Sequence, residues 1–269
     1  MPSAYRQFFA LTAEPFGADV ARSQILATPA VSAVEERVHY ALGLGAIALV
    51  TGEVGSGKST ALRYAVGGLH PSEVQVLAVT ASSGSILELY RLVLAELGHD
   101  APGSSRAQMT RIIRREVLEL ARAKKRKTLL VIDEASLLRL EVLTELHTLT
   151  QFEHDSKPYL PLVLAGQANL ADHLQYRTAL PLASRVVARS HLKGIDQKTM
   201  EEYLRHHLRL AGVERILFED AAITAIHQGS GGLFRKANHL ARGALIAAAH
   251  QQAPLVSAEH VRIAATELF

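Results

Sequence analysis

The sequence contains the stretch Gly52-Glu53-Val54-Gly55-Ser56-Gly57-Lys58-Ser59, which matches the pattern G-x-x-x-x-G-K-[ST]. An apolar run at residues 47–51 precedes it and predicts a buried strand, and a segment with helical spacing follows. Glycines let the backbone wrap around a phosphate chain, and the N–H groups at the start of the next helix attract anions. The stretch, extended by Thr60, therefore predicts a nucleotide site, with Lys58 beside the β- and γ-phosphates and the Ser59 hydroxyl on Mg²⁺.

A second candidate site is Thr128-Leu129-Leu130-Val131-Ile132-Asp133-Glu134, where two acids end a buried apolar run. Beside a phosphate site, Asp133 is expected to hold the Mg²⁺ shell through water. Glu134 is expected to orient and deprotonate the water that attacks the terminal phosphate. The alternative is that Asp133 only caps the following helix and Glu134 is solvated. The presence of the phosphate-binding stretch favours nucleotide hydrolysis.

The pattern of apolar residues predicts an α/β fold. Strands are expected at residues 47–51, 74–80, 129–132, 160–165 and 186–192. Because segments with helical spacing lie between these runs, we expect a parallel five-stranded sheet flanked by helices.

The strand pattern stops near Gly194, and the rest of the chain predicts a small all-helical lid domain. Helices are expected at residues 196–211, 218–228, 233–251 and 257–268. Asp196 is a candidate N-cap, and Gly212 and Gly229 are expected to end helices. We therefore predict two domains, a nucleotide-binding core at residues 1–194 that includes the N-terminal segment, and the lid at residues 195–269.

The composition excludes several other classes of protein. Of the 269 residues, 48% are apolar and 20% are charged, as in ordinary globular domains. The absence of cysteine excludes disulfides, cysteine-based zinc sites and thiol catalysis. The N-terminus does not resemble a signal peptide, and the longest apolar stretch, residues 41–50, is about half of the roughly 20 residues that span a bilayer. A cytoplasmic protein without membrane contact is expected.

With these motifs in place, the chain resembles the AAA+ ATPases and, within them, the ExeA-like branch. That branch includes secretion-pathway ATPases and transposition helpers related to TniB and TnsC. Besides the two motifs above, the resemblance rests on Phe8-Phe9-Ala10-Leu11, Glu14-Pro15-Phe16, Leu164-Ala165-Gly166-Gln167, Ser184-Arg185 and Gly231-Gly232-Leu233-Phe234-Arg235-Lys236-Ala237-Asn238. It implies an AAA+ fold that hydrolyses ATP with Mg²⁺ and self-associates into a hexamer-like ring or a helical filament.

The same resemblance implies roles for three further residues. Gln167 takes the sensor-1 position, from which an amide touches the γ-phosphate or the attacking water, and Arg235 takes the sensor-2 position on the lid. Arg185 is the candidate arginine finger, which stabilises charge in the site of a neighbouring subunit. Arg177 and Arg189 are alternative fingers. Gln167 and Arg235 are alternatively solvated surface residues.

Basic residues gather between Arg106 and Lys127, where nine Lys or Arg face only two acids. One interpretation is a solvated helix face. The other is a surface that binds the backbone of double-stranded DNA without sequence preference. The candidate contacts are Ser104, Arg106, Arg114, Arg115, Lys124 and Lys125.

The resemblance leaves three functions open. The first is a transposition helper that oligomerises on DNA with ATP, selects a target and recruits or stimulates a transposase. The second is a secretion-pathway ATPase of the ExeA type. That family continues into a membrane helix and a cell-wall-binding region, whereas this sequence stops at Phe269, so we expect the transposition role first. The third is a generic AAA+ switch that does not bind DNA.

Overall fold

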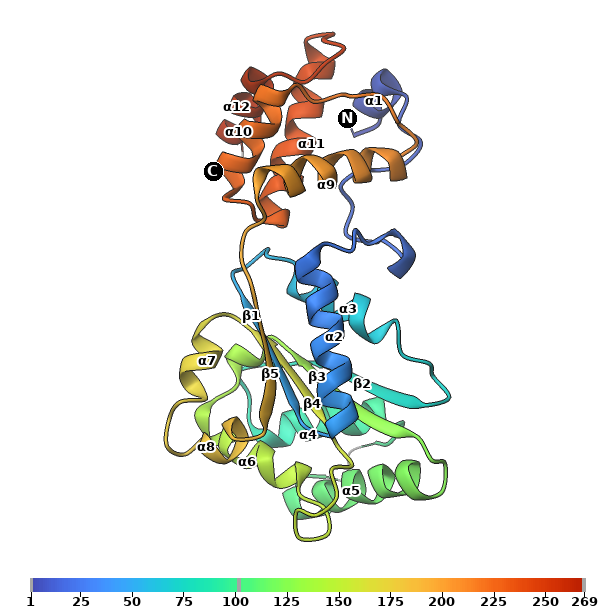
Figure 1. Cartoon of the computed structure of the whole chain (residues 1–269), viewed down its shortest axis with the longest axis vertical. Coiled ribbons are helices and arrows are strands. Elements are labelled where there is room, and N and C mark those ends of the chain that lie inside the picture. The colour runs from blue at the N-terminus through green and yellow to red at the C-terminus, as the bar shows by residue number, and fades with distance from the viewer. Residues whose placement is uncertain (1, 101–102, 268–269) are drawn as a thin grey trace. The chain divides into compact units, whose positions relative to one another are not determined.

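The computed structural model describes residues 2–100 and 103–267, and the chain divides into two compact units. The sheet unit consists of Pro29–Gly52 and Lys58–Leu192. The helical unit consists of the residues up to Thr28, residues 53–57 and the residues from Lys193 onward. Figure 1 labels the α-helices and strands of both units.

The sheet unit contains the predicted five-stranded parallel sheet. The strands are β1 (Ile47–Gly52), β2 (Val74–Thr80), β3 (Lys127–Asp133), β4 (Leu162–Gly166) and β5 (Val186–Leu192). Their order is β2-β3-β4-β1-β5, and every neighbouring pair is parallel. The carboxyl ends of β3, β4 and β1 therefore lie side by side, and this edge of a parallel sheet is where such folds bind ligands.

Helices cover both faces of this sheet because its central strands are apolar on both sides. All six residues of β1 are buried. Ile47 and Leu49 belong to a core cluster with α4 (Ile86–Glu96), α5 (Arg106–Arg122) and α6 (Leu140–Thr150). Since side chains alternate along a strand, Ala48 and Val50 face the other side, where β1 contacts α2 (Pro29–Leu44) and α3 (Lys58–Val66). Three short helices, η2 (Ala135–Leu137), α7 (Asn169–His173) and α8 (Leu180–Ala183), complete the unit.

The helical unit contains the four predicted lid helices, followed along the chain as α9 (Gln197–Leu210), α10 (Asp220–Ser230), α11 (Phe234–His250) and α12 (Ala258–Glu267). The Asp196 carboxylate caps α9 as predicted, since its Oδ1 accepts a hydrogen bond from the Thr199 N–H at 2.8 Å. α10, α11 and α12 contact one another around small buried residues such as Ala241, Ala244 and Ala248.

The N-terminal segment folds with the lid helices and not, as predicted from the sequence, with the nucleotide-binding core. It contains α1 (Pro2–Phe9) and the short helix η1 (Arg22–Gln24), and both belong to the helical unit. The physical reason is burial: Phe9 and Phe16 are among the largest fully buried side chains and join the core of the lid helices. Arg242 of α11 also donates to Glu14 at 2.7 Å and to the Phe16 carbonyl at 2.8 Å.

One predicted helix end lies elsewhere. Gly212 follows α9 with a φ of +85°, as expected, but Gly229 lies inside α10. α10 ends instead at Gly231, which has a φ of +61° in the left-handed region that glycine adopts without strain. The adjoining Gly232 accepts a hydrogen bond from the Ile195 N–H at 3.0 Å, so this turn packs against the predicted domain boundary.

The longest helices that the structure describes, α5 and α11, have 17 residues each. A bilayer-spanning helix needs about 20 mostly apolar residues. Within residues 2–100 and 103–267, no helix has the length and apolar composition that crossing a membrane requires.

Candidate nucleotide-binding site

The stretch after β1 adopts a backbone that only glycine accommodates easily. Gly55 and Gly57 have φ values of +84° and +92°, a region that residues with a Cβ rarely occupy. The Ser56 N–H donates to the Glu53 carbonyl at 3.2 Å, which closes the turn. α3 begins directly afterwards at Lys58, so the N–H groups of its first turn are available for an anion.

Lys58 is buried, yet its charged nitrogen has polar contacts. Its Nζ donates to the Gly52 carbonyl at 3.0 Å. A buried ammonium requires such partners because its desolvation is otherwise costly. The contact holds the side chain alongside the loop, where the motif predicts the β- and γ-phosphates.

Ser59 and Asp133 are brought together across 74 positions of sequence. The Ser59 hydroxyl donates to Asp133 Oδ2 at 2.7 Å, and Asp133 Oδ1 accepts the Glu134 N–H at 2.8 Å. Hydroxyl and carboxylate oxygens are the ligands that Mg²⁺ prefers. The two side chains therefore lie close enough together to hold Mg²⁺, as the sequence predicts.

Glu134 occupies a strained backbone position at the carboxyl end of β3. Its φ of +53° lies in the left-handed region, which is uncommon for a residue with a side chain, and η2 begins at the next residue. Such outliers persist where the surrounding structure over-determines them, and they cluster at active sites. The observation supports the predicted role of Glu134 as the base that activates water.

Gln167 directly follows β4, the strand between β3 and β1 in the sheet. The strand order thus places its backbone between the end of the strand that carries Asp133 and the start of the phosphate-binding loop. The Gln167 N–H donates to Ser136 Oγ at 3.2 Å, and a Cβ on Gly166 would lie 2.7 Å from the Ser136 nitrogen. Gly166 is therefore required for this close approach. The sequence motif contains this glycine, but only the structure shows why it is needed.

Arg235 lies in the first turn of α11 and is exposed. Its backbone N–H donates to the Gly55 carbonyl at 3.3 Å. Both residues belong to the helical unit. The guanidinium itself has no partner among the described residues. Its sensor-2 role remains a prediction.

Arg185, the candidate finger, is held by an acid that the sequence analysis did not identify. Its two terminal nitrogens donate to Asp155 Oδ1 and Oδ2 at 2.8 and 2.7 Å. This bidentate pair holds the pKa of the Asp155 carboxyl below its usual range, through hydrogen bonding with Arg185. Arg177 and Arg189, the alternative fingers, are exposed. No pattern in the sequence pairs residues 155 and 185, because the contact depends on how the loop before β4 folds.

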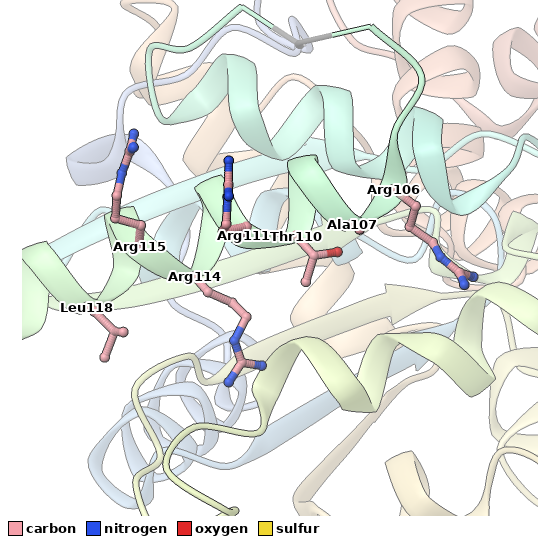
Figure 2. Close-up of a pocket in the computed structure, with 7 residues that line it drawn as sticks. All are labelled: Arg106, Ala107, Thr110, Arg111, Arg114, Arg115 and Leu118. Carbon is pink, nitrogen blue, oxygen red and sulfur yellow. The ribbon is translucent and has the colours of Figure 1, made fainter.

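The predicted DNA contacts lie on α5 and directly before and after it. Some of them are exposed without strong partners, and others have partners within the protein. Four arginines line one groove of about 610 Å³ on α5: Arg106, Arg111, Arg114 and Arg115. Figure 2 shows these side chains pointing away from the helix in several directions. Ser104 precedes the helix, and Lys124 and Lys125 follow it; all three are exposed.

Arg114 has a structural role that the sequence analysis did not foresee. Its guanidinium donates to the carbonyls of Thr148, at 3.1 Å, and of Gln151, and it lies 4.6 Å from the centre of the Phe152 ring. Thr148 lies in the last turn of α6 and Gln151 is its C-cap residue, at the end where a helix leaves acceptors without partners inside the helix. Arg114 therefore caps α6 and is poorly placed to bind DNA.

Two of the other predicted contacts are engaged in surface ion pairs. Arg106 pairs with Glu145 at 2.5 Å, and Arg115 pairs with Glu116 at 2.9 Å. Exposed pairs of this kind contribute little to stability, so a phosphate could replace either acid. Arg111, absent from the predicted set, has no hydrogen-bond or ion-pair partner in the described part of the chain.

The chain is similar to known proteins in both sequence and structure. The family model described as "AAA domain" matches residues 43–174. General secretion pathway protein A of Aeromonas hydrophila is 34% identical over 254 residues, which cover 91% of this chain and 45% of that protein. The chain thus spans less than half the length of this curated relative.

Two solved structures share the fold at low sequence identity. Cdc6p from Pyrobaculum aerophilum has a TM-score of 0.72 at 16% identity, covering 93% of this chain and 72% of that one. The Aeropyrum pernix ORC1 protein in complex with DNA has a TM-score of 0.68 at 18% identity, covering 91% and 67%. Together with the loop at residues 52–59, these similarities show that the chain has the P-loop AAA+ fold, and that residues 43–174 match the AAA domain.

Proposed function

We propose that this chain binds ATP with Mg²⁺, assembles into an oligomer on double-stranded DNA, and acts there as a transposition helper. In this role it selects a target and recruits or stimulates a transposase. Hydrolysis returns the assembly to its subunits. The proposal rests on the nucleotide site, on the basic surface around α5, and on the shared fold with an ORC1 protein whose structure contains DNA.

The chemistry of hydrolysis follows from the residues already described. Lys58 and the N–H groups at the start of α3 would neutralise the phosphates, and Ser59 and Asp133 would hold the metal. Glu134 takes the proton of a water molecule as the water oxygen attacks the γ-phosphorus and the bond to the β-phosphate oxygen breaks. Gln167 orients this water. Arg185 stabilises the charge that develops in the site of a neighbouring copy.

The observation that carries the DNA proposal is the set of exposed cations on α5 and directly after it, of which Arg111 lines the groove. Arg111 and Lys125 have no hydrogen-bond or ion-pair partners among the described residues, and Lys124 lies 3.7 Å from Glu119 across an exposed, weak pair. Such cations bind phosphates without reading bases, and each contact alone is weak. An assembled oligomer repeats these contacts along the duplex, so affinity rises with valency. DNA binding should therefore require ATP.

A charge-removal variant tests this surface. Arg111→Gln, Lys124→Gln and Lys125→Gln are combined while Arg114 is retained, because Arg114 caps α6. With a slowly hydrolysed ATP analogue, the unmodified protein is expected to bind duplexes of unrelated sequence equally. Its affinity should fall steeply with salt. Each lost phosphate contact reduces the magnitude of the slope of log K against log salt by about 0.9. Removing three contacts should therefore reduce that magnitude by about 2 to 3 per subunit.

The matched control removes three exposed cations from the helical unit, Lys198→Gln, Arg209→Gln and Arg215→Gln, and is expected to keep the slope. Fluorescence polarisation at several salt concentrations measures both variants. If the unmodified protein with ATP binds no DNA at low salt, the transposition proposal fails. If it binds and both variants behave alike, DNA binding stands and the surface around α5 is the wrong one.

The second candidate is a secretion-pathway ATPase, favoured by the 34% identity to General secretion pathway protein A. It shares the same ATP chemistry but needs no DNA. The DNA-binding assay therefore separates the two. ATP hydrolysis that is unchanged by duplex DNA at all concentrations, in a protein that does not bind DNA, would favour the secretion role.

A further inference from the structure

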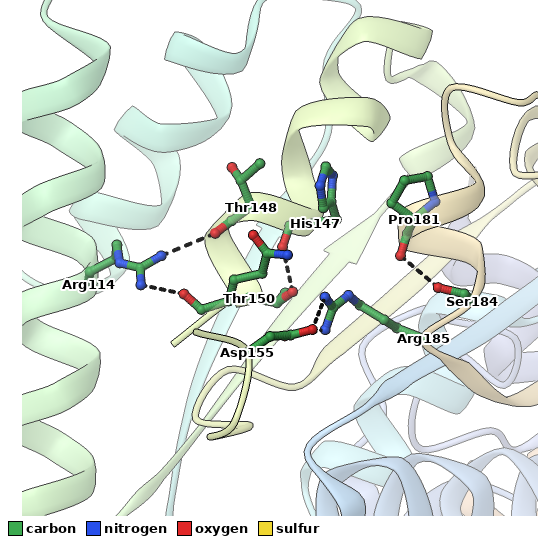
Figure 3. A network of polar contacts seen from close by, with 9 residues as sticks. Arg114, His147, Thr148, Thr150, Asp155, Pro181, Ser184 and Arg185 are labelled. Carbon is green, nitrogen blue, oxygen red and sulfur yellow. Dashed lines mark hydrogen bonds and ion pairs between the residues drawn. The ribbon is translucent and has the colours of Figure 1, made fainter. Parts of the chain in front are cut away.

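The partner of Arg185 comes from a loop that is unusually constrained. Asp155 lies between α6 and β4, in a run of three residues with left-handed backbone, Glu153, His154 and Asp155, whose φ values are +48°, +55° and +67°. Residues with a Cβ adopt this region rarely, and three in succession require support from the surrounding structure. Figure 3 shows the Asp155 carboxylate facing the guanidinium of Arg185.

Several contacts hold this loop in place from both ends. Phe152 is buried, packs edge-on against Tyr159 at 5.6 Å between ring centres, and pairs with Lys157 through a backbone bridge. The Ser156 hydroxyl donates to the Glu153 carbonyl at 2.7 Å, and Arg122 of α5 pairs with the Glu153 carboxylate. The loop therefore has a defined conformation.

Arg114 fixes the same loop at its start. Its bonds to the last carbonyls of α6 and its stacking on Phe152 join α5 to the residues that lead to Asp155. Part of the basic character of α5 thus serves to hold the acid that pairs with Arg185.

The pair satisfies Arg185 only in part. Asp155 takes one N–H from each terminal nitrogen, but the Nε–H is buried without a hydrogen-bond partner among the described residues. An unpaired buried donor carries a free-energy cost. The carboxylate also cancels the positive charge that a finger needs. Guanidinium groups bind phosphate in the same bidentate manner as carboxylate, so the two anions compete for one cation.

We propose that Asp155 is an internal competitor that keeps Arg185 from acting until a neighbouring copy presents its nucleotide phosphates. This inference rests on the proposed role of Arg185 in a neighbour's site. In the single subunit Arg185 is bound to Asp155. In the assembled protein it exchanges Asp155 for phosphate, so the pair opposes assembly and sets the protein concentration at which hydrolysis begins.

The test is the dependence of ATP hydrolysis on protein concentration, without DNA. Asp155→Asn keeps the shape of the side chain and removes its charge. Because an ion pair at the surface contributes up to about 1 kcal/mol, the concentration of half-maximal activity is expected to fall by about threefold to fivefold, with the saturated rate unchanged. Asp155→Glu keeps the acid and should resemble the unmodified protein more closely. Asp172→Asn, which removes an exposed acid of α7, is the matched control and should change nothing.

The double variant Asp155→Asn with Arg185→Ala decides whether the effect passes through Arg185. It should behave as Arg185→Ala alone. A shift that persists in the double variant would overturn the inference, as would a lowered saturated rate in Asp155→Asn or an unchanged half-maximal concentration. Thermal melting confirms that each variant is folded.

A different result would show that Arg185 is not the arginine finger at all. If Arg185→Ala hydrolyses ATP as fast as the unmodified protein at saturating concentration, Arg185 is not the finger, and the proposed neighbour's site is wrong. Mixing Arg185→Ala with Glu134→Gln checks the same point. Recovered activity shows that an intact Arg185 in one copy serves an intact Glu134 in another. If Arg185→Ala is impaired while Asp155→Asn is neutral, only the competitor role fails.

Discussion

At the scale of single residues, the nucleotide site combines one buried cation with a pair of acids in different environments. Lys58 is buried and bonded to the Gly52 carbonyl, while Asp133 is bonded to Ser59 and to the backbone. Glu134, by contrast, has no side-chain partner in the described part of the chain, so its carboxylate is free to contact water. The two neighbouring acids therefore suit the two separate roles proposed for them, Asp133 in holding the metal and Glu134 in taking a proton.

This separation predicts the behaviour of Glu134→Gln. The amide keeps the shape of the side chain but is far too weak a base to accept the proton, so ATP binding should remain while hydrolysis falls by about 100-fold or more. Lys58→Ala is the contrasting variant, because it removes the charge over the phosphates and should abolish binding. Titration with a fluorescent ATP analogue measures binding, and phosphate release measures turnover. Near-normal turnover in Glu134→Gln would assign the base to another residue.

At the scale of elements, helix ends explain where the charged residues of α5 act. A helix leaves its last carbonyls without partners inside the helix, and cations near that end are stabilising. At the end of α6 this cation is Arg114 of the neighbouring α5. Its planar guanidinium contacts two carbonyls and the Phe152 ring at once. Arg114, which the sequence groups with a basic surface patch, is thus part of the packing between two helices.

Arg114→Ala should therefore destabilise the sheet unit. Two hydrogen bonds from a charged donor and one ring contact are lost, which is worth about 2 kcal/mol for a partly exposed side chain. Arg111→Ala, one turn earlier on the same helix, should change the free energy of unfolding by less than about 0.5 kcal/mol. Urea denaturation followed by circular dichroism compares the two. Equal stability of both variants would show that Arg114 does not support α6.

At the scale of the whole molecule, folding joins the beginning of the chain to its last third. His207 of α9 illustrates the connection: it is buried, and its Nδ1 donates to the Pro15 carbonyl at 2.7 Å. Burial lowers the pKa of His207 to about 4, mainly because the charged ring would lose its hydration. The N-terminal segment therefore stays attached most firmly when this histidine is neutral.

The lowered pKa predicts how stability depends on pH. Since the folded-state pKa of about 4 lies below the unfolded value near 6.5, the unfolded chain binds the extra proton, and stability falls as the pH drops through this window. Between pH 7.5 and pH 5 the loss from His207 should be about 2 kcal/mol. His207→Gln, whose amide can still donate to Pro15, should show a smaller loss. Urea unfolding at both pH values measures it, and an identical pH dependence in the two proteins would contradict the assignment.

The sequence by itself determined the features that depend on local patterns. The spacing of Gly52, Lys58 and Ser59 specifies a phosphate-binding turn because few residue types fit that backbone, and the apolar runs specify buried strands because both faces of a parallel sheet are covered. For the same reason the five strands, the four lid helices and the Asp196 cap were predictable. Gly229 does not end a helix as predicted, because a glycine inside a helix and a glycine that ends one look alike in sequence.

Only the tertiary structure decided the features that depend on long-range contacts. It placed residues up to Thr28 with the lid helices, because the burial of Phe9 and Phe16 outweighs their proximity in sequence to the core. The tertiary structure also decided which role each charged side chain has. A run of cations looks uniform in sequence, but whether a cation such as Arg114 caps a helix or faces solvent, and whether Arg185 is free or bound to Asp155, depends on which partners the fold brings within about 3 Å. Charges acquire their roles from distance, and distance between remote residues is a property of the folded chain.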